Sequence, residues 1–256
     1  MISPKKANLI AAKVLHCECF SPHIQRITIS ADAFANWPAD TEGRYFKLFI
    51  THQGKKPNLF SPKRSYTVHS FDAVNKTLVF DAVVNRHNGP ATQLIGQLQG
   101  GETLYIAGPG KKKLDNFSAE HYLFIGDITS INAIRAYLNL LPANTPAQVY
   151  LMVPTEADAM AYQNDALQAH NNHQIIHWII NPQQTECNQI LLQSLAQIPQ
   201  LPQKTKAFIA TEAGCLRLVK NYLQQDVNLS RRNLYASAYW KLGTNADKLT
   251  ELKQQG

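Results

Sequence analysis

The apolar residues of this chain follow one period in its first half and another in its second half, and this change limits the folds available to it. In the first half they recur every two residues, as at Leu78, Phe80, Ala82 and Val84. A period of two is typical of strands with two different faces. In the second half, short continuous apolar runs recur about 27 to 31 residues apart, which fits strands that are buried on both faces and joined by crossover helices.

The first half is predicted to be a small antiparallel β-barrel or β-sandwich. Turn residues such as Ser21-Pro22 and Gly100-Gly101 separate its strand-like segments. A helix is expected over residues 90–98, because proline suits the first turn of a helix. The predicted strands cover residues 14–20, 23–30, 44–51, 64–70, 77–85 and 102–107.

The second half is predicted to be a doubly wound parallel α/β domain. Residues 131–141 have helical spacing, with Ser130 as a candidate N-cap and Pro142 as the expected end of the helix. A turn-rich, charged stretch separates the two halves, so the expected domains are 1–115 and 116–256, the second with a C-terminal helical extension. The five predicted strands begin near Tyr122, Val149, Ile175, Ala207 and Leu234.

Composition and charge exclude several classes of protein. Of 256 residues 45% are hydrophobic and 17% charged, so a buried core is expected and disorder is excluded as the main state. No apolar stretch approaches the roughly 18 residues of a membrane span, and Lys13 interrupts the only run that could suggest a signal peptide. The cysteines at 17, 19, 187 and 215 lack metal-ligand spacing, which predicts reduced thiols, a cytoplasmic protein and no bound metal. A net charge of +7 favours an anionic partner or substrate.

Two short motifs in the first half have the chemistry of a cofactor site. Residues 64–67 read Arg-Ser-Tyr-Thr, and alternation places Arg64 and Tyr66 on one face, where a guanidinium can pair with phosphate and a ring can cover a flat cofactor. Residues 88–92 read Asn-Gly-Pro-Ala-Thr and open the expected helix, whose first amides are free to bind phosphate. Each motif alone is more often ordinary structure, an exposed arginine beside a half-buried tyrosine or a plain helix start. Their order and spacing together are more specific.

Two further segments are weaker signals. Residues 126–130 read Gly-Asp-Ile-Thr-Ser and lack the G-x-G-x-x-G dinucleotide fingerprint, so a plain β-to-α turn is the ordinary interpretation. Residues 111–113 are three lysines in a predicted loop, a run that is usually solvated. Basic residues do not alternate with aromatic ones, and no helix-turn-helix pattern is present, so a nucleic-acid partner is not expected.

Over roughly residues 14–243 the sequence resembles the siderophore-interacting proteins, which are FAD-containing, NAD(P)H-dependent ferric-siderophore reductases. The resemblance implies a ferredoxin-reductase-like fold, with a flavin-binding antiparallel β-barrel followed by a parallel-sheet α/β domain for nicotinamide. Five segments carry this resemblance, and the last of them, residues 238–243, is the most family-specific. These segments are residues 64–68, 89–92, 100–110, 122–133 and 238–243, which read R-S-Y-T-V, G-P-A-T, G-G-E-T-L-Y-I-A-G-P-G, Y-L-F-I-G-D-I-T-S-I-N-A and A-Y-W-K-L-G.

In the barrel the resemblance implies that Arg64 contacts an FAD phosphate and that Tyr66 packs on the isoalloxazine. It implies that Thr67 and Val68 meet the flavin edge. The pyrophosphate would be held by Gly89, Pro90, Ala91 and Thr92. His69 stands where the family usually has arginine, and the loss of a permanent charge predicts weaker FAD binding. Asn85 stands at the position of a family histidine, with His87 two residues later.

In the second domain the resemblance implies that Gly126, Asp127 and Thr129 border the nicotinamide. It also implies that Tyr239 and Trp240 lie near the flavin at the domain interface. Cofactors are therefore expected to meet residues from both halves of the chain.

Acidic residues after the second strand of this domain predict a weak preference for NADH over NADPH. A 2′-phosphate usually needs a nearby cation, and residues 154–158 offer Glu156 and Asp158 instead. The alternative is that both acids simply begin a helix, where they are favourable. Cys215 is interpreted as a core residue, because it lies on an apolar helix face.

The resemblance implies that FAD passes electrons to a ferric siderophore, an anionic or hydroxamate chelate, from NADH, NADPH or reduced ferredoxin. Lys47 and Lys241 are candidate substrate contacts, and each is equally well an ordinary surface lysine. No catalytic side chain is expected, since the flavin carries the chemistry. The alternatives are a flavin-dependent ferredoxin or flavin reductase and a siderophore-binding escort without redox activity. The protein is expected to be a monomer.

Overall fold

The computed structural model describes residues 9–51, 55–58, 60–86, 88–114, 117–165, 173–183, 187–198 and 201–243. The chain divides into two compact units, unit 1 at Met1–Lys112 and unit 2 at Lys113–Gly256. The expected boundary between residues 115 and 116 and the expected helical extension after residue 243 lie outside the described residues.

Unit 1 contains a closed β-barrel in which neighbouring strands are antiparallel. The order around it is β1-β2-β5-β4-β3-β6, and β6 closes the barrel on β1. Of the two predicted β architectures, the barrel is confirmed and the sandwich is wrong. The strands are β1 Leu9–Ser21, β2 Ile24–Ser30, β3 Tyr45–Phe49, β4 Lys63–Asp72, β5 Thr77–Val83 and β6 Thr103–Ala107, and the helices are η1 Asp32–Asn36 and α1 Pro90–Gly96.

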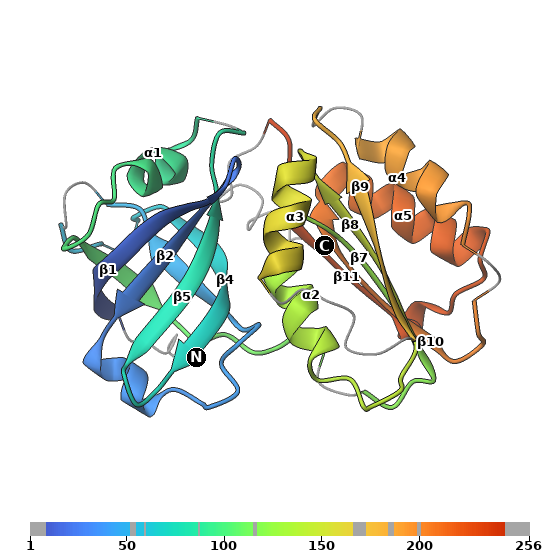
Figure 1. Ribbon diagram of the computed structural model, residues 1–256, viewed down its shortest axis with the longest axis horizontal. Helices are drawn as coiled ribbons and strands as arrows, with labels where there is room; N and C mark the ends of the chain where they lie inside the picture. Colours follow the sequence, from blue (N-terminus) through green and yellow to red (C-terminus); the bar gives the residue numbers. More distant parts are fainter. Residues whose placement is uncertain are drawn as a thin grey trace, which may run out of the picture. The chain divides into compact units, whose positions relative to one another are not determined.

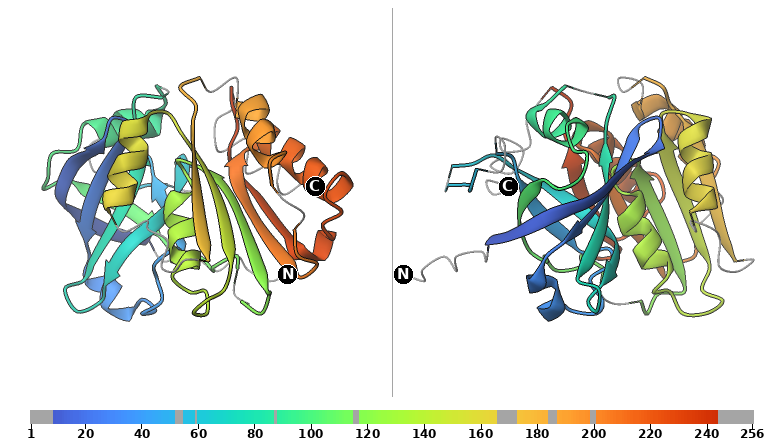
Figure 2. Two further views of the ribbon diagram at one scale, coloured as in Figure 1. Left: turned by 45° about the vertical axis from the view of Figure 1, so that its right-hand side comes forward. Right: turned by 60° about the vertical axis from the view of Figure 1, so that its left-hand side comes forward.

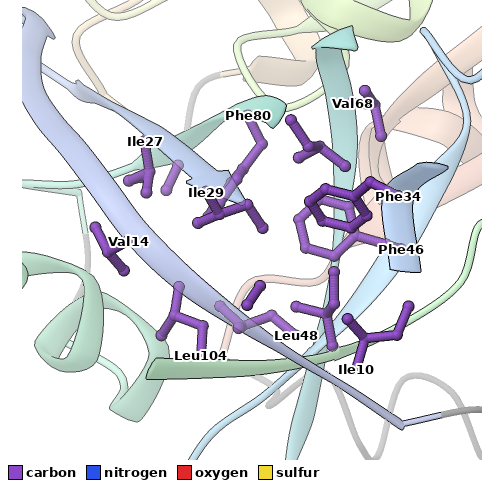
Figure 3. Packing of buried hydrophobic residues seen from close by; sticks show 14 of the residues in the cluster. Ile10, Val14, Ile27, Ile29, Phe34, Phe46, Leu48, Val68, Phe80 and Leu104 are labelled. Atoms are coloured by element: carbon purple, nitrogen blue, oxygen red, sulfur yellow. The ribbon is translucent and has the colours of Figure 1, made fainter. Parts of the chain in front are cut away.

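The barrel core forms because alternate residues of each strand point inward. Figure 3 shows labelled side chains of the barrel core, among them Phe46, Phe80 and Leu104, which fill the space between the strands. Strand β1 begins at Leu9 rather than at the predicted Val14, because its first residues pair with β6. That partner lies far away in sequence, so local periodicity could not reveal the true start of the strand.

Unit 2 contains a five-stranded parallel sheet in the order β11-β10-β7-β8-β9. Helices α2 and α3 cover one face and α4 and α5 the other (Figures 1 and 2), which confirms the predicted doubly wound domain. The strands are β7 His121–Asp127, β8 Ala147–Val153, β9 Gln174–Ile180, β10 Thr205–Glu212 and β11 Leu234–Trp240. The helices are α2 Ile131–Leu138, α3 Glu156–Asn164, α4 Cys187–Leu195, α5 Ala213–Gln225 and η3 Arg231–Asn233.

Different side chains fill the two faces of this sheet. Toward α4 and α5 the core is mainly aliphatic, and Cys215 belongs to it with no exposed surface, which confirms its interpretation as a core residue. On the other face aromatic rings predominate: Tyr137 of α2 meets Phe208 with 4.9 Å between ring centroids, and Phe208 stacks on Tyr235 at 5.4 Å. Helix α2 ends at Leu138 and not just before Pro142.

The early end of α2 has a local cause. The amides of Leu140 and Leu141 donate to the carbonyls three residues earlier, those of Tyr137 and Leu138, so the last turn is tighter than an α-helix.

The strand order of unit 2 also has a consequence for ligands. From β7 the chain first adds strands on one side and then returns to add β10 and β11 on the other, and open sheets bind ligands at the carboxyl ends of the strands where this reversal occurs.

No helix in the described part of the chain is both long enough and apolar enough to cross a membrane.

A buried ion pair joins two strands of the barrel. Arg26 donates from Nε and Nη2 to the two carboxylate oxygens of Asp81 at 2.7 and 3.0 Å, and the two side chains are only 9% and 3% exposed. The Arg26 guanidinium also lies 3.7 Å above the ring of Phe20. Loss of either charge would leave the other buried without this ion pair.

We therefore expect Asp81→Ala to lower the free energy of unfolding by about 3–5 kcal/mol, measured by denaturant titration. The matched control is Glu120→Ala, which removes a carboxylate from an exposed pair with Lys204 and should change stability little. Equal losses in the two variants would contradict the assigned importance of burial.

Candidate functional site

The strand β4 presents Arg64 and Tyr66 on the same face. Tyr66 pairs with Phe46 and Arg64 with Leu48 of β3, and directly opposed residues share a face of the sheet. The ring centroid of Tyr66 lies 6.1 Å from that of Phe46 and 5.1 Å from that of Phe80, so the rings of two core residues pack against it. Burial raises the pKa of the Tyr66 phenol to about 12, so the ring stays neutral. A partly buried aromatic surface beside a guanidinium suits a flat cofactor that carries phosphate.

The opposite face of β3 and β4 carries the predicted substrate lysine. Lys47 Nζ donates to Ser65 Oγ at 2.6 Å and lies 5.7 Å above the Tyr45 ring. Thr67 belongs to this face, because it pairs with Tyr45. A cation and an aromatic ring are thus brought next to the hydroxyl-bearing residues of β4.

Two expected flavin contacts are constrained by the barrel itself. The side chain of Val68 is fully buried, and its backbone N–H already donates to the carbonyl of Arg44 at 2.9 Å. His69 is 7% exposed and is the extra residue where the pairing of β4 with β5 shifts between Val68 and Ser70. Of the residues expected at the flavin edge, Thr67 therefore has the more accessible side chain.

Helix α1 begins as predicted, at a glycine followed by proline. Gly89 is the N-cap in an extended conformation and has no side chain with which to close the helix start. Ala91 is buried and Thr92 partly buried. Asn85 lies beyond the end of β5 with a φ of 58° and donates to the carbonyl of Pro22 at 2.9 Å, so the predicted strand over 77–85 is two residues too long. His87 lies outside the described residues.

At the reversal point of the unit 2 sheet, the carboxylate of Asp127 gathers donors from three segments. Its Oδ2 accepts Trp240 Nε1 at 2.8 Å and the Thr211 hydroxyl at 2.9 Å. Its Oδ1 accepts both the backbone amide and the hydroxyl of Thr129. Burial raises the pKa of the Asp127 carboxyl, while these hydrogen bonds act in the opposite direction. The structure thus joins Asp127, Thr129 and Trp240, and adds Thr211, which sequence reasoning did not assign.

The turn after Asp127 explains the glycine before it. A Cβ at Gly126 would overlap Ser130 Oγ and Ile134 Cδ1. The Ser130 hydroxyl accepts from the Asp127 amide at 3.1 Å and donates to the Asp127 carbonyl at 3.0 Å. Ser130 is the N-cap residue of α2, as predicted, but its hydroxyl bonds the turn and caps no helix amide.

Glu212 is a second acidic residue at this edge. Its Oε2 accepts the amides of Gly214 and Cys215 at the start of α5, and its Oε1 accepts the amide of Leu242 at 3.1 Å. The sequence analysis did not assign Glu212, and no motif points to its contact with Leu242, because the two residues are far apart in the chain. Lys241, between Trp240 and Leu242, is exposed.

The loop after β8 contains the two acids expected near a ribose. Thr155 and Asp158 form a capping box at the start of α3, and Asp158 is fully buried. For Asp158 the alternative interpretation, an acid that begins a helix, is confirmed. Glu156 is exposed in the first turn, so it alone remains available to a nucleotide. No group of three or more His, Cys, Asp or Glu side chains suited to a metal ion occurs among the described residues.

Comparison with known proteins places this geometry in a family. The model for the siderophore-interacting FAD-binding domain matches residues 59–113, and the siderophore-interacting protein model matches residues 119–243. The chain is 26% identical over 248 residues to the ferric vibriobactin reductase of Vibrio cholerae, covering 90% of this chain and 89% of the relative.

Solved structures agree on the fold. The siderophore-interacting protein SipS from Aeromonas hydrophila superimposes with a TM-score of 0.79 at 22% identity, over 96% of this chain and 97% of that one. A ferredoxin-NADP+ reductase from Plasmodium falciparum superimposes with a TM-score of 0.65 at 13% identity, over 91% and 97% of the two chains. The chain belongs to the siderophore-interacting protein family, as an FAD-dependent oxidoreductase with the ferredoxin-reductase fold.

Proposed function

We propose that the protein is a ferric-siderophore reductase that takes electrons from NAD(P)H and delivers them singly to Fe(III). The observation that carries this proposal is that Arg64 and Tyr66 lie on one face of β4, within the matched FAD-binding segment. The ring of Tyr66 packs against the core residue Phe80. FAD, when bound, accepts electrons as a pair and releases them one at a time, which a one-electron acceptor such as Fe(III) requires. The reduction would take place in the cytoplasm, where the free thiols of Cys17 and Cys19 are stable.

The barrel residues have separable tasks in this proposal. Arg64 pairs with an FAD phosphate, Tyr66 packs on the isoalloxazine, and the Thr67 hydroxyl meets its edge. Gly89, which has no Cβ, lets the pyrophosphate approach the first amides of α1. Unit 2 supplies the nicotinamide site at the carboxyl edge of its sheet, where Gly126 and Thr129 lie.

The substrate is an anionic ferric chelate in this proposal, and it contacts Lys47 and Lys241. The net charge of +7 favours its approach. To meet the chelate, Lys47 would share or release its hydrogen bond to Ser65. Iron stays with the chelator until it is reduced, so no protein ligand to iron is required.

The deciding experiment is anaerobic mixing of the flavin-loaded protein with NADH, NADPH or reduced ferredoxin. Ferric 2,3-dihydroxybenzoate, an anionic catecholate complex, and ferrioxamine B, a hydroxamate, are then added in parallel. Flavin bleaching by a nucleotide, followed by recolouring with formation of Fe(II), supports the proposal. Bleaching only by reduced ferredoxin would identify a different electron donor. Recolouring by added free flavin or oxidised ferredoxin, but by neither ferric chelate, would identify a different reductase, and a protein that binds no flavin would point to an escort.

Removing the Arg64 charge should weaken FAD binding. A charge-assisted hydrogen bond to phosphate contributes roughly 1.5–3 kcal/mol, so Arg64→Ala should raise the Kd for FAD about ten- to a hundredfold, measured by titrating apoprotein with FAD. Lys63→Ala is the control, because it removes the same charge from the adjacent residue on the opposite face of β4. Unchanged affinity in Arg64→Ala would contradict the phosphate contact.

Charge at the substrate site should be visible in steady-state kinetics. The double variant Lys47→Ala, Lys241→Ala should raise the apparent KM for ferric 2,3-dihydroxybenzoate, and added salt should do the same to the unaltered protein, because exposed charges are screened beyond about 8–10 Å. Lys204→Ala, which removes an exposed lysine paired with Glu120, should leave KM unchanged. A normal KM in the double variant would place the substrate elsewhere.

Nucleotide preference should depend on Glu156. We expect faster flavin reduction by NADH than by NADPH, since the exposed carboxylate of Glu156 repels a 2′-phosphate. Glu156→Arg should shift the ratio toward NADPH, whereas Glu120→Arg, the same exchange on the loop before β7, should not. Faster reduction by NADPH in the unaltered protein would refute the preference.

A further inference from the structure

Two acidic side chains fix the end of β11 at two points. Asp127 Oδ2 accepts the indole Nε1 of Trp240 at 2.8 Å, and Glu212 Oε1 accepts the backbone amide of Leu242 at 3.1 Å. Asp127 ends β7 and Glu212 ends β10. The residues from Trp240 to Leu242, here called the 240–242 segment, are therefore bound to two different strands.

The pairing of β10 with β11 shows why this segment needs such contacts. Thr211 pairs with Ala238, but Glu212 pairs with Trp240, so Tyr239 is an extra residue in the strand. A bulge redirects the side chains beside it and interrupts the regular ladder. Side-chain hydrogen bonds then hold the chain where backbone pairing ends.

The carboxylate of Asp127 has no capacity left for a ligand. An ionised carboxylate offers about four acceptor positions. The Thr129 amide, the Thr129 and Thr211 hydroxyls and the Trp240 indole occupy them, and only 4% of the residue is exposed. Asp127 therefore serves its neighbours and does not bind a nucleotide directly.

The choice of glutamate at position 212 points to a second task beside capping. Serine, threonine, aspartate and asparagine are the usual N-cap residues. In Glu212 one oxygen, Oε2, already accepts both capped amides, those of Gly214 and Cys215. The longer side chain leaves Oε1 free to reach Leu242, which helix capping alone does not require.

We propose that Asp127 and Glu212 are positioning residues that clamp the 240–242 segment and so present Lys241 at the carboxyl edge of the sheet. Lys241 is exposed between the two anchored residues. Because the clamp holds Trp240 by its indole and Leu242 by its backbone amide, less conformational entropy is lost when the ammonium group of Lys241 meets an anion. This inference rests on the proposed function, in which Lys241 contacts the ferric chelate.

The first test observes the clamp without any activity. The chain has three tryptophans, so nitrogen-15 labelling gives three indole N–H resonances that single Trp→Phe variants assign. Asp127→Ala removes the acceptor of the indole N–H, so the Trp240 resonance should move upfield. Thr211→Val is the control, because it removes another donor to the same Oδ2 and keeps the indole bond. A Trp240 resonance that stays in place in Asp127→Ala would overturn the clamp.

The second test asks whether the clamp acts through Lys241. Glu212→Asp keeps an N-cap carboxylate but is too short for Leu242, so the melting temperature should hold while the apparent KM for ferric 2,3-dihydroxybenzoate rises about two- to tenfold at unchanged kcat. In a Lys241→Ala background the same substitution should add nothing, since residues that act through one group are not additive. An unchanged KM in Glu212→Asp, or an equal rise in both backgrounds, would overturn the proposal.

Failure of the proposed function has a different signature. If Lys241→Ala by itself has a normal KM, Lys241 is no substrate contact and the presentation of this lysine is refuted with it. The indole resonance of Trp240 still decides whether Asp127 holds the segment.

Discussion

The hydrogen bonds to the buried carboxylate of Asp127 hold the carboxyl edge of unit 2 together. A carboxylate that leaves water without hydrogen bonds is strongly unfavourable, so its four donors are a requirement of the fold. They come from the turn after β7, from the end of β10 and from the end of β11. The ends of three strands are thereby fixed to one group at the reversal point of the sheet.

The two units use different parts of their sheets for chemistry. In unit 1 the candidate residues lie on strand faces, where Phe46 and Phe80 support the ring of Tyr66. In unit 2 they lie at the carboxyl ends of β7 and β11 and in the turns that follow, as in open α/β sheets generally. The barrel thus offers a firm aromatic surface, whereas the α/β unit offers an edge whose shape depends on hydrogen bonds between turns.

The helix starts are closed in different ways. In unit 2 the start of α3 is closed by Thr155 with Asp158, and the start of α5 by Glu212. In unit 1 the residue before α1 is Gly89, which has no side chain for this purpose. Helix α2 of unit 2 also begins without a side-chain cap, because the Ser130 hydroxyl bonds the turn before it.

The two-part architecture can be predicted from the sequence alone, because periods of two and continuous apolar runs are local properties that burial imposes on each strand. The sequence also identified Arg64, Tyr66 and Gly89 as candidates, since their chemistry is visible in short motifs. The start of β1 at Leu9 and the burial of Asp158 in a capping box, in contrast, became visible only in the folded chain. The bonds from Asp127 to Trp240 and from Glu212 to Leu242 join residues far apart in the chain. Such contacts leave no periodic signal, because they depend on which strand ends the folded sheet brings together.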